Sequence, residues 1–187
     1  MNQTNLYTQL EALPANMTGE IIDGRLIAQP RPAGPHILVE SALSMKIGPP
    51  YQYGSNGPGG WWIAVEPEVH FTRDIEVTVP DIAGWRKERM TQYPRSHRYE
   101  IVPDWVCEIA SPSTEATDRT RKMPLYARYG VQYLWLVKPL LKTLEVYQLN
   151  NGKWLNIDNY KNDDKVSAVP FQEIVIQLQD LWIKDEE

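Results

Sequence analysis

Three residues of this chain have the types and positions that metal-assisted hydrolysis requires. Glu108 is an acid inside the apolar run from Trp105 to Ala110, which we predict to be a buried strand. Asp81 closes a second predicted strand, from Glu76 to Ile82, and Lys122 lies on the early turns of a predicted helix. Carboxylates bind Mg²⁺, the ion polarises a phosphodiester, and a lysine can orient the attacking water. These residues therefore indicate a magnesium-dependent site that cleaves phosphodiester bonds.

The same residues also have an ordinary structural interpretation. In that alternative, Asp81 caps a turn and Glu108 pairs with a surface arginine. Glu108 still needs a partner, because an unpaired acid in an apolar strand is costly. Lys122 and Tyr126 are four residues apart and share one face of the helix. If that face is buried, Lys122 also needs a partner, and the carboxylates would supply it.

Strands and helices that alternate along the chain must position these residues. Apolar periodicity, turn residues and breakers predict the following elements: a helix over 5–13, a hairpin over 19–28, a helix from 36 to 48, a strand over 61–65 extended by 66–71, the strands over 76–82 and 105–110, a helix over 113–129, a strand over 133–137, a hairpin over 144–157, and a final strand or helical turn within 171–182. Residues 48–60 are rich in Gly and Pro and are predicted to form a loop. This order predicts a mixed central β-sheet flanked by helices, of α/β or α+β class.

The composition is that of a soluble globular protein. The 187 residues are 42 % hydrophobic and 23 % charged, which is enough to bury a full core. We predict a single domain over residues 1–187, with a core at about 15–150 and an acidic C-terminal extension at 158–187. The single cysteine, Cys107, excludes an intramolecular disulfide, and neither a signal peptide nor a membrane span is predicted. We expect a cytoplasmic protein.

The charge is unevenly distributed. The net charge is −5, and residues 158–187 alone carry this excess, so that residues 1–157 are neutral overall. Within the neutral part, residues 85–98 hold five basic residues and one acid. This basic segment is either a solvated loop or a loop that contacts phosphates beside the site.

Several sequence motifs together form a pattern that is specific enough to compare with a known protein family. They are Val79-Pro-Asp-Ile82, the run from Pro103 to Thr114, and Asp118-xxx-Lys122-xxx-Tyr126-Ala127-xx-Gly130-Val131. With these motifs the chain resembles the Uma-two family of restriction-endonuclease-like proteins, within the PD-(D/E)XK nuclease superfamily. Gly19-Glu-Ile-Ile-Asp-Gly24 and the helix opening at His36 also resemble the family, so that the resemblance covers about residues 15–150.

The resemblance implies a restriction-endonuclease-like core and a role for each site residue. Asp81 would be the aspartate of the PD motif, and Glu108 the acid of the (D/E)XK motif. The usual lysine position is Ala110 here, so the resemblance points to Lys122 on the next helix. Glu20 would match an N-terminal acid that completes the metal site. The implied cofactor is Mg²⁺, with Mn²⁺ as the alternative, held by Asp81, Glu108 and Glu20.

Two positions depart from the family pattern. Tyr133 and Lys138 stand where family members usually have acids, and we interpret both as changes of surface or interface. Other kinds of site have weaker support: His36, His70, His97 and Cys107 lack zinc-binding spacing, and His36 is interpreted as a hydrogen-bonding residue at a helix start.

The leading hypothesis is a magnesium-dependent endodeoxyribonuclease with Asp81, Glu108, Lys122 and Glu20 at its site and DNA as its substrate. On this hypothesis, replacing Glu108 or Lys122 by alanine abolishes cleavage and leaves thermal stability nearly intact. The rival is a non-catalytic binding or interaction module that keeps the nuclease fold. A third alternative is a structural homo-oligomer, such as a homodimer, whose Trp and Tyr residues form an interface.

Overall fold

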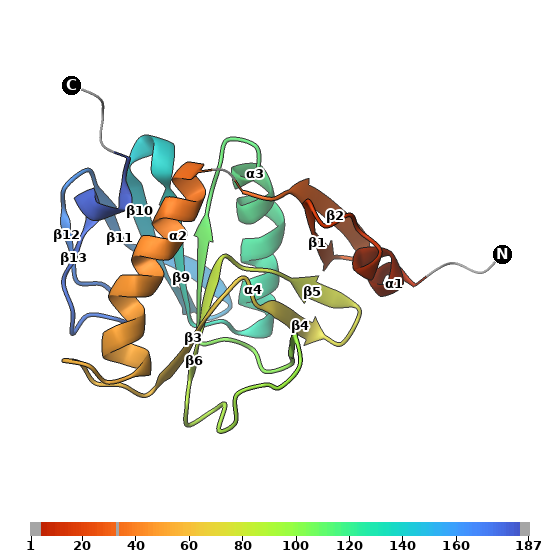
Figure 1. The fold of residues 1–187 in the computed structure, drawn as a ribbon, viewed down its shortest axis with the longest axis horizontal. Coiled ribbons are helices and arrows are strands. Elements are labelled where there is room, and N and C mark those ends of the chain that lie inside the picture. The colour runs from red at the N-terminus through yellow and green to blue at the C-terminus, as the bar shows by residue number, and fades with distance from the viewer. Residues whose placement is uncertain (1–4, 33, 184–187) are drawn as a thin grey trace.

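The strands of the chain form a central mixed sheet and two smaller sheets (Figure 1). The computed structural model describes residues 5–32 and 34–183. The central sheet has the order β11-β10-β9-β8-β6-β3, the second sheet β2-β1-β5-β4-β7, and the third β12-β13. Within the central sheet, β8 and β9 are parallel and the other neighbours are antiparallel. The fold is therefore a mixed α+β structure, as the sequence predicts.

The helices and strands have the following bounds: α1 (Leu6–Glu11), β1 (Met17–Ile22), β2 (Arg25–Pro30), α2 (Gly34–Ile47), β3 (Trp61–Val65), β4 (Glu68–Thr72), β5 (Glu76–Thr78), β6 (Ile82–Arg86), β7 (Arg98–Tyr99), β8 (Trp105–Ile109), α3 (Glu115–Thr117), α4 (Met123–Tyr129), β9 (Tyr133–Lys138), β10 (Thr143–Asn150), β11 (Lys153–Lys161), β12 (Lys165–Val166) and β13 (Ile176–Gln177). Helical turns also cover Gly48–Gln52, Asp118–Lys122, Pro139–Leu141 and Leu178–Leu181. Each predicted hairpin is present, and Asp23-Gly24 and Asn151-Gly152 supply the positive φ angles of their turns.

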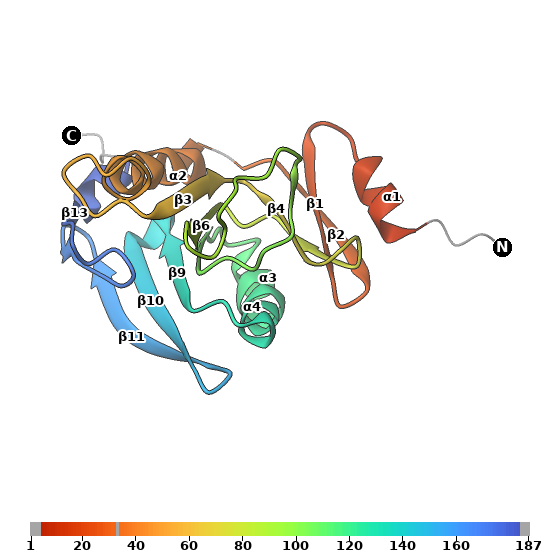
Figure 2. The same ribbon diagram turned by 90° about the horizontal axis from the view of Figure 1, so that it is seen from below.

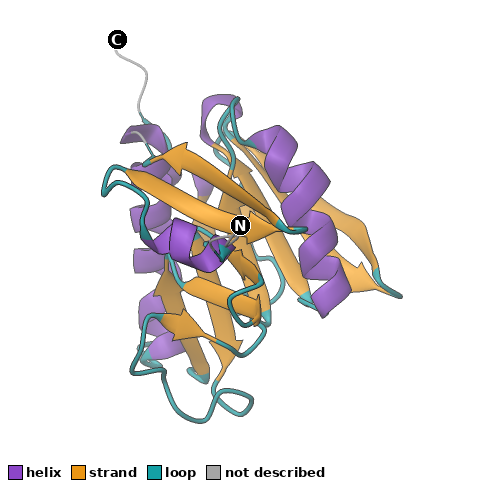
Figure 3. Cartoon of the chain, turned by 90° about the vertical axis from the view of Figure 1, so that its right-hand side faces the viewer, coloured by secondary structure: helices purple, strands orange, loops and turns teal. Residues whose placement is uncertain are grey.

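Helices cover both faces of the central sheet. Figure 2 shows α2 on one side and α3 with α4 on the other, and Figure 3 shows the strands between them. Successive side chains of β8 point to opposite faces, so Trp105, Cys107 and Ile109 belong to the core under α2. Val106 belongs to the core under α4. Glu108 lies on this second face, which directs its carboxylate toward α4.

Two of the predicted strands are longer than the observed strands. The prediction that one strand runs from Glu76 to Ile82 is wrong, because β5 and β6 belong to different sheets and Val79-Pro-Asp81 joins them. The prediction that 66–71 extends the strand over 61–65 is also wrong, since β4 lies in the second sheet. Proline cannot donate to a strand ladder, and Glu66 has a φ of 45°, which turns the chain between the sheets.

The helical regions differ from expectation in detail. The predicted loop over 48–60 begins with a π-helical turn, Gly48–Gln52, which buries Tyr51. The predicted helix over 113–129 is built from α3, a π-helical turn over Asp118–Lys122, and α4, and it ends as predicted at Gly130 in the left-handed conformation. A π-turn has i→i+5 hydrogen bonds and is frequently found at functional sites. In this helix both ends of the π-turn, Asp118 and Lys122, are buried.

The C-terminal segment packs into the main core. Phe171, Leu178, Leu181 and Trp182 are buried together with residues of α2 and the central sheet. Hence residues of the acidic region also supply apolar contacts. Among the described helices, none is long and apolar enough to span a bilayer.

Candidate active site

A buried cluster of charged side chains forms where β1, β8 and the helix after β8 meet. The Lys122 ammonium donates a hydrogen bond to Glu108 Oε2 at 2.7 Å and lies 3.0 Å from Glu20 Oε1. The Tyr126 hydroxyl donates to Glu108 Oε1 at 2.5 Å. All three charged side chains are at most 4 % exposed. The structure thus brings Glu20, Glu108 and Lys122 together, as the sequence predicts.

The local structure explains how these side chains converge. Glu108 projects from the α4 face of β8, and Lys122 and Tyr126 lie one helical turn apart on the face that packs against it. Glu20 comes from β1 of the second sheet, where its Oε1 also accepts a hydrogen bond from the Val79 amide at 2.8 Å. That bond fixes the second sheet next to the chain segment that carries Asp81.

The electrostatics of the cluster favour a charged lysine. Burial opposes the charge on Lys122, but the surrounding carboxylates, above all Glu108 and Glu20, outweigh it and raise the pKa of Lys122 well above its usual value. Asp118 lies one helical turn before Lys122, and burial raises its pKa to about 6, with further contributions from the charges of Asp81 and Glu20. Negative groups therefore outnumber the single ammonium.

Asp81 lies in the connection before β6, and not at the end of a strand. Its Oδ2 accepts a hydrogen bond from the Ile109 amide at 2.5 Å, which places Asp81 next to the backbone of Glu108. Its Oδ1 lies 3.0 Å from His36 Nε2, and because a carboxylate only accepts, the imidazole donates. Asp81 is therefore close to the buried cluster but makes its side-chain contact with α2.

Two residues of α2 complete the surroundings of Asp81. Among the described residues, one group of three side chains has ligand atoms close enough for a metal ion, and it consists of His36, Glu40 and Asp81, all within 4.8 Å of one another. The sequence interpretation gave His36 a hydrogen-bonding role, which it has, and missed Glu40. The available signal was an acid one helical turn after His36, in an otherwise apolar stretch.

The pKa values of both α2 residues are shifted upward. Burial lowers the pKa of His36, but the hydrogen bond and charge of Asp81, with the charge of Glu40, outweigh burial and leave it above the usual value. Burial raises the pKa of Glu40 to about 7, and the charges of Asp81 and Glu66 act in the same direction. Glu40 thus titrates close to neutral pH.

A cleft of about 440 Å³ opens at Asp81. The residues that line it are Thr18, Ala28, Gln29, Pro30, Arg31, Pro32, Pro35, His36, Glu66, Val79, Asp81, Ala110, Ser111, Pro112, Ser113, Thr114, Pro139 and Leu140. Of the predicted site residues, Asp81 lies in the wall of the cleft, whereas Glu20, Glu108 and Lys122 are buried behind it. A substrate in this cleft would meet Asp81, His36 and the cation of Arg31.

Of the three predicted magnesium ligands, Asp81 can meet a cation from the cleft, whereas Glu108 and Glu20 already contact the Lys122 ammonium. Both oxygens of Glu108 are engaged, with Lys122 and Tyr126, and the ammonium lies between Glu108 and Glu20 where a cation would otherwise bind. Asp81 remains the predicted ligand that is open to the cleft. We therefore derive no step that needs one ion bound by all three acids.

The basic segment over 85–98 makes contacts away from Asp81. β6 begins next to Asp81 and ends at Arg86, so the segment starts about 15 Å away at the opposite end of the strand. Arg89 pairs with Asp104 at 2.7 Å, and Arg98 lies 3.5 Å from Asp74. These pairs favour the structural interpretation of the segment.

Lys138, one of the two departures from the family pattern, takes part in a network of ion pairs. Its ammonium lies 2.8 Å from Glu145 and 3.5 Å from Glu115. Arg119 binds the same two acids, at 2.8 and 2.9 Å. The network connects β9 and β10 to the start of the helix that carries Lys122.

Comparisons with known proteins identify the fold and the family of the chain. A solved structure described as "a putative nuclease belonging to DUF820", from Anabaena variabilis, is similar with a TM-score of 0.70 and 24 % sequence identity, over 94 % of this chain and 96 % of that one. This likeness establishes the fold. A comparison with curated proteins gave no significant match. The model of the Uma2 family, described as "putative restriction endonuclease", matches residues 5–179, a wider range than the expected 15–150. The chain therefore belongs to the Uma2 family of restriction-endonuclease-like proteins.

Proposed function

We propose that this protein is a metal-dependent endodeoxyribonuclease that hydrolyses phosphodiester bonds in DNA. The observation that carries the proposal is the position of Asp81, in the wall of a 440 Å³ cleft and bonded to the backbone amide next to Glu108. Family membership and the nuclease fold support it. The expected cation is Mg²⁺, with Mn²⁺ as the alternative, and when bound it would polarise the phosphate and acidify a water molecule.

The side chains of the site would divide the work of hydrolysis. Arg31 lies at the cleft with a largely exposed side chain and would bind the phosphate of the substrate. The oxygen of water forms the new bond to phosphorus, and the P–O bond to the leaving sugar breaks. The proton released from water ends on the oxygen of the leaving sugar. Asp81 would accept a hydrogen bond from the attacking water and so orient it.

The role of Lys122 needs a refinement. The expectation that Lys122 orients the attacking water stays a prediction. In the structure its ammonium contacts Glu108 and Glu20 and is closed off from the cleft. We propose that Lys122 acts as a positioning residue, which holds Glu108 in the geometry that places the adjoining Ile109 amide against Asp81.

Cleavage of supercoiled plasmid and of labelled oligonucleotides, with Mg²⁺ or Mn²⁺, tests the proposal. We expect wild-type cleavage, a loss of at least about 100-fold in Asp81→Asn, and little change in Asp163→Asn, which removes an exposed carboxylate far along the chain. Asparagine can still accept the Ile109 hydrogen bond, so the fold should persist. Full cleavage by Asp81→Asn would refute the assignment.

The burial of Glu108 and Lys122 also favours a second candidate, a DNA-binding module that does not cleave. On that alternative, DNA binding persists in Asp81→Asn and no ion gives cleavage by the wild type. Light scattering of the same preparations would test the alternative of a homodimer.

A further inference from the structure

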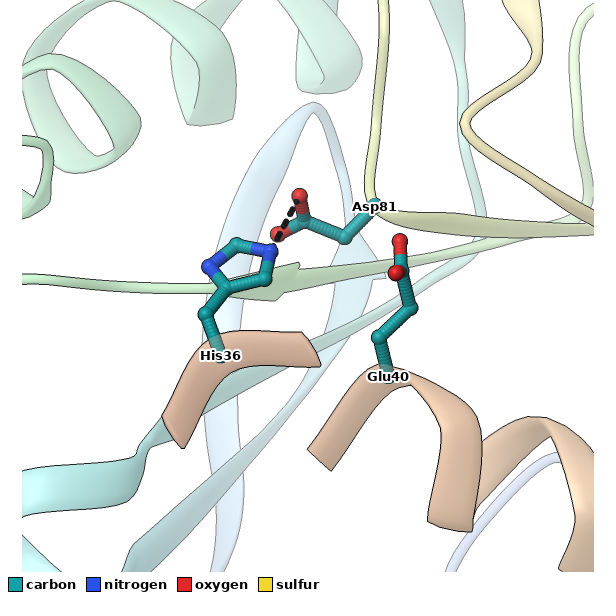
Figure 4. A group of neighbouring side chains, drawn as sticks. All are labelled: His36, Glu40 and Asp81. Atoms are coloured by element: carbon teal, nitrogen blue, oxygen red, sulfur yellow. Dashed lines mark hydrogen bonds and ion pairs between the residues drawn. The ribbon is translucent and has the colours of Figure 1, made fainter. Parts of the chain in front are cut away.

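The first turns of α2 present two metal-binding side chains to Asp81. His36 and Glu40 are four residues apart, so they lie on one face of the helix, and that face is turned toward Asp81 (Figure 4). The figure shows the Glu40 carboxylate pointing toward Asp81 beside the imidazole. The three residues thus converge from a helix and a loop that are distant in sequence.

Glu40 lacks a partner that its burial requires. The residue is 8 % exposed, and its Oε1 is buried without a hydrogen-bond partner among the described residues. The charges that act on it most strongly are those of Asp81 and Glu66, which are also acids. A buried carboxylate is strongly unfavourable unless it is paired or binds a metal. The lysine of the same helix, Lys46, pairs with Asp180 at 2.6 Å instead.

The imidazole of His36 does not fill this need. Its Nε2 is directed to Asp81 Oδ1 at 3.0 Å, and the structure shows no hydrogen bond between it and Glu40 among the described side chains. A positive group that contacts Glu40 and Asp81 together would satisfy both. An ion in this position would also bind His36 Nε2, whose proton would be released to solvent or replaced by a proton on Nδ1.

The distances suit one ion. All three ligand atoms lie within 4.8 Å of one another. Two ligands at right angles, each about 2.1 Å from an octahedral ion, are separated by about 3 Å, which is the distance between His36 Nε2 and Asp81 Oδ1. The small movement that remains is a closer approach of the Glu40 carboxylate, which is on a flexible side chain of the same helix as His36.

We propose that His36, Glu40 and Asp81 form the site of a divalent cation, and that this site prefers Mn²⁺ to Mg²⁺. Mg²⁺ favours an all-oxygen environment and keeps its waters, whereas an imidazole nitrogen suits first-row transition ions. The ligand set differs from Asp81, Glu108 and Glu20, because the Lys122 ammonium already contacts the latter two acids. The use of this ion in DNA cleavage rests on the proposed function, but its binding does not.

Isothermal titration of the 187-residue chain with Mn²⁺ alone, and then with Mg²⁺ alone, tests the inference without DNA. We expect one Mn²⁺ per chain and weaker binding of Mg²⁺. His36→Gln and Glu40→Gln should each weaken Mn²⁺ binding at least about tenfold, and His36→Gln should reduce the preference over Mg²⁺. Mn²⁺ should also broaden the NMR signals of the His36 ring before those of His70 and His97.

Two control variants separate the possible outcomes. Glu66→Gln removes an acid that lines the same cleft and lies 3.8 Å from Arg31, and it should change Mn²⁺ binding less than about twofold. If Glu66→Gln and Glu40→Gln weaken Mn²⁺ binding equally, the effect arises from the overall negative charge of the region. That result would overturn the proposed site. Binding that survives in His36→Gln and Glu40→Gln but is lost in Glu108→Gln would assign the ion to the other acids.

The result is independent of the cleavage assay. If Mn²⁺ binds as expected and no DNA is cut, the cation site stands and the proposed nuclease function fails. If DNA is cut and no variant of His36 or Glu40 alters Mn²⁺ affinity, the function stands and the ligand set proposed here fails. Unfolding temperatures of all variants would show that each protein is folded.

Discussion

At the scale of single residues, the site depends on the burial of one ammonium between carboxylates. Lys122 and Glu108 were predicted as partners because an acid in an apolar strand and a lysine on a buried helix face each need one. Their burial overturns the expectation that alanine variants keep their thermal stability. Removing Lys122 leaves two buried carboxylates without the ammonium, and removing Glu108 leaves the ammonium with Glu20 as its remaining ion-pair partner in this cluster.

Lys122→Met should therefore destabilise the protein by about 3–5 kcal/mol, because Glu108 and Glu20 would remain buried without the ammonium. Adding Glu108→Gln to Lys122→Met should recover part of this loss, since one buried charge disappears. Urea unfolding of the two single variants and the double variant measures the coupling. Lys153→Met, at an exposed position, is the control. A double variant as unstable as the sum of the singles would contradict the pairing.

Glu40 shows what residue types alone leave undecided. The sequence places His36 and Glu40 one turn apart, but it does not say which face of the helix is buried or what opposes it. The partner, Asp81, is 41 residues beyond Glu40 and reaches α2 through the packing of the sheet. Sequence spacing therefore predicts which side chains are neighbours within one helix or strand. It predicts less readily which side chains from different elements the tertiary structure brings together.

At the scale of elements, the local signals were sufficient for most helices and hairpins. Asp23-Gly24 and Asn151-Gly152 turned the hairpins, and Gly130 ended α4, because left-handed backbone conformations favour these residue types. Strand partners were not predictable in the same way. β5 and β6 are separated by only three residues yet enter different sheets, and that choice depends on distant strands.

The C-terminal end of α4 provides a test at this scale. Gly130 has a φ of 82°, and a Cβ added there would meet nothing within 4 Å among the described residues. Gly130→Ala should therefore cost about 1 kcal/mol through backbone strain alone. Gly48→Ala is the comparison: the space is also open there and φ is not positive, so a smaller loss is expected even though the following Pro49 restricts this position. Equal effects in thermal unfolding would exclude backbone strain as the cause.

At the scale of the whole molecule, the C-terminal segment completes the core under α2. The Phe171 ring contacts four other aromatic rings, Tyr51, Trp61, Trp105 and Trp135, with centroids 4.6–5.7 Å apart. The sequence indicates this contribution, because residues 166–183 are rich in apolar side chains despite the negative net charge of the region, and a final strand or helical turn is predicted within 171–182. A charge count describes the surface of a segment and does not exclude a buried side.

Phe171→Ala should lower the free energy of unfolding by about 3–5 kcal/mol, because the lost ring leaves a cavity between rigid aromatic side chains. Val175→Ala, at a position that is 60 % exposed, should change it by less than about 0.5 kcal/mol. Calorimetric unfolding of both variants checks the difference. A small effect of Phe171→Ala would mean that the C-terminal segment is an independent extension.

The buried contact of Glu20 with Lys122 also constrains how the chain folds. The hairpin of β1 and β2 has local turn chemistry and can form early, but docking it onto the rest of the molecule buries Glu20. Docking before the helix arrives would leave that carboxylate without the ammonium, at a penalty of several kcal/mol. The hairpin and the helix should therefore dock in one cooperative step late in folding, and partly folded states with only one of them in place should be sparsely populated.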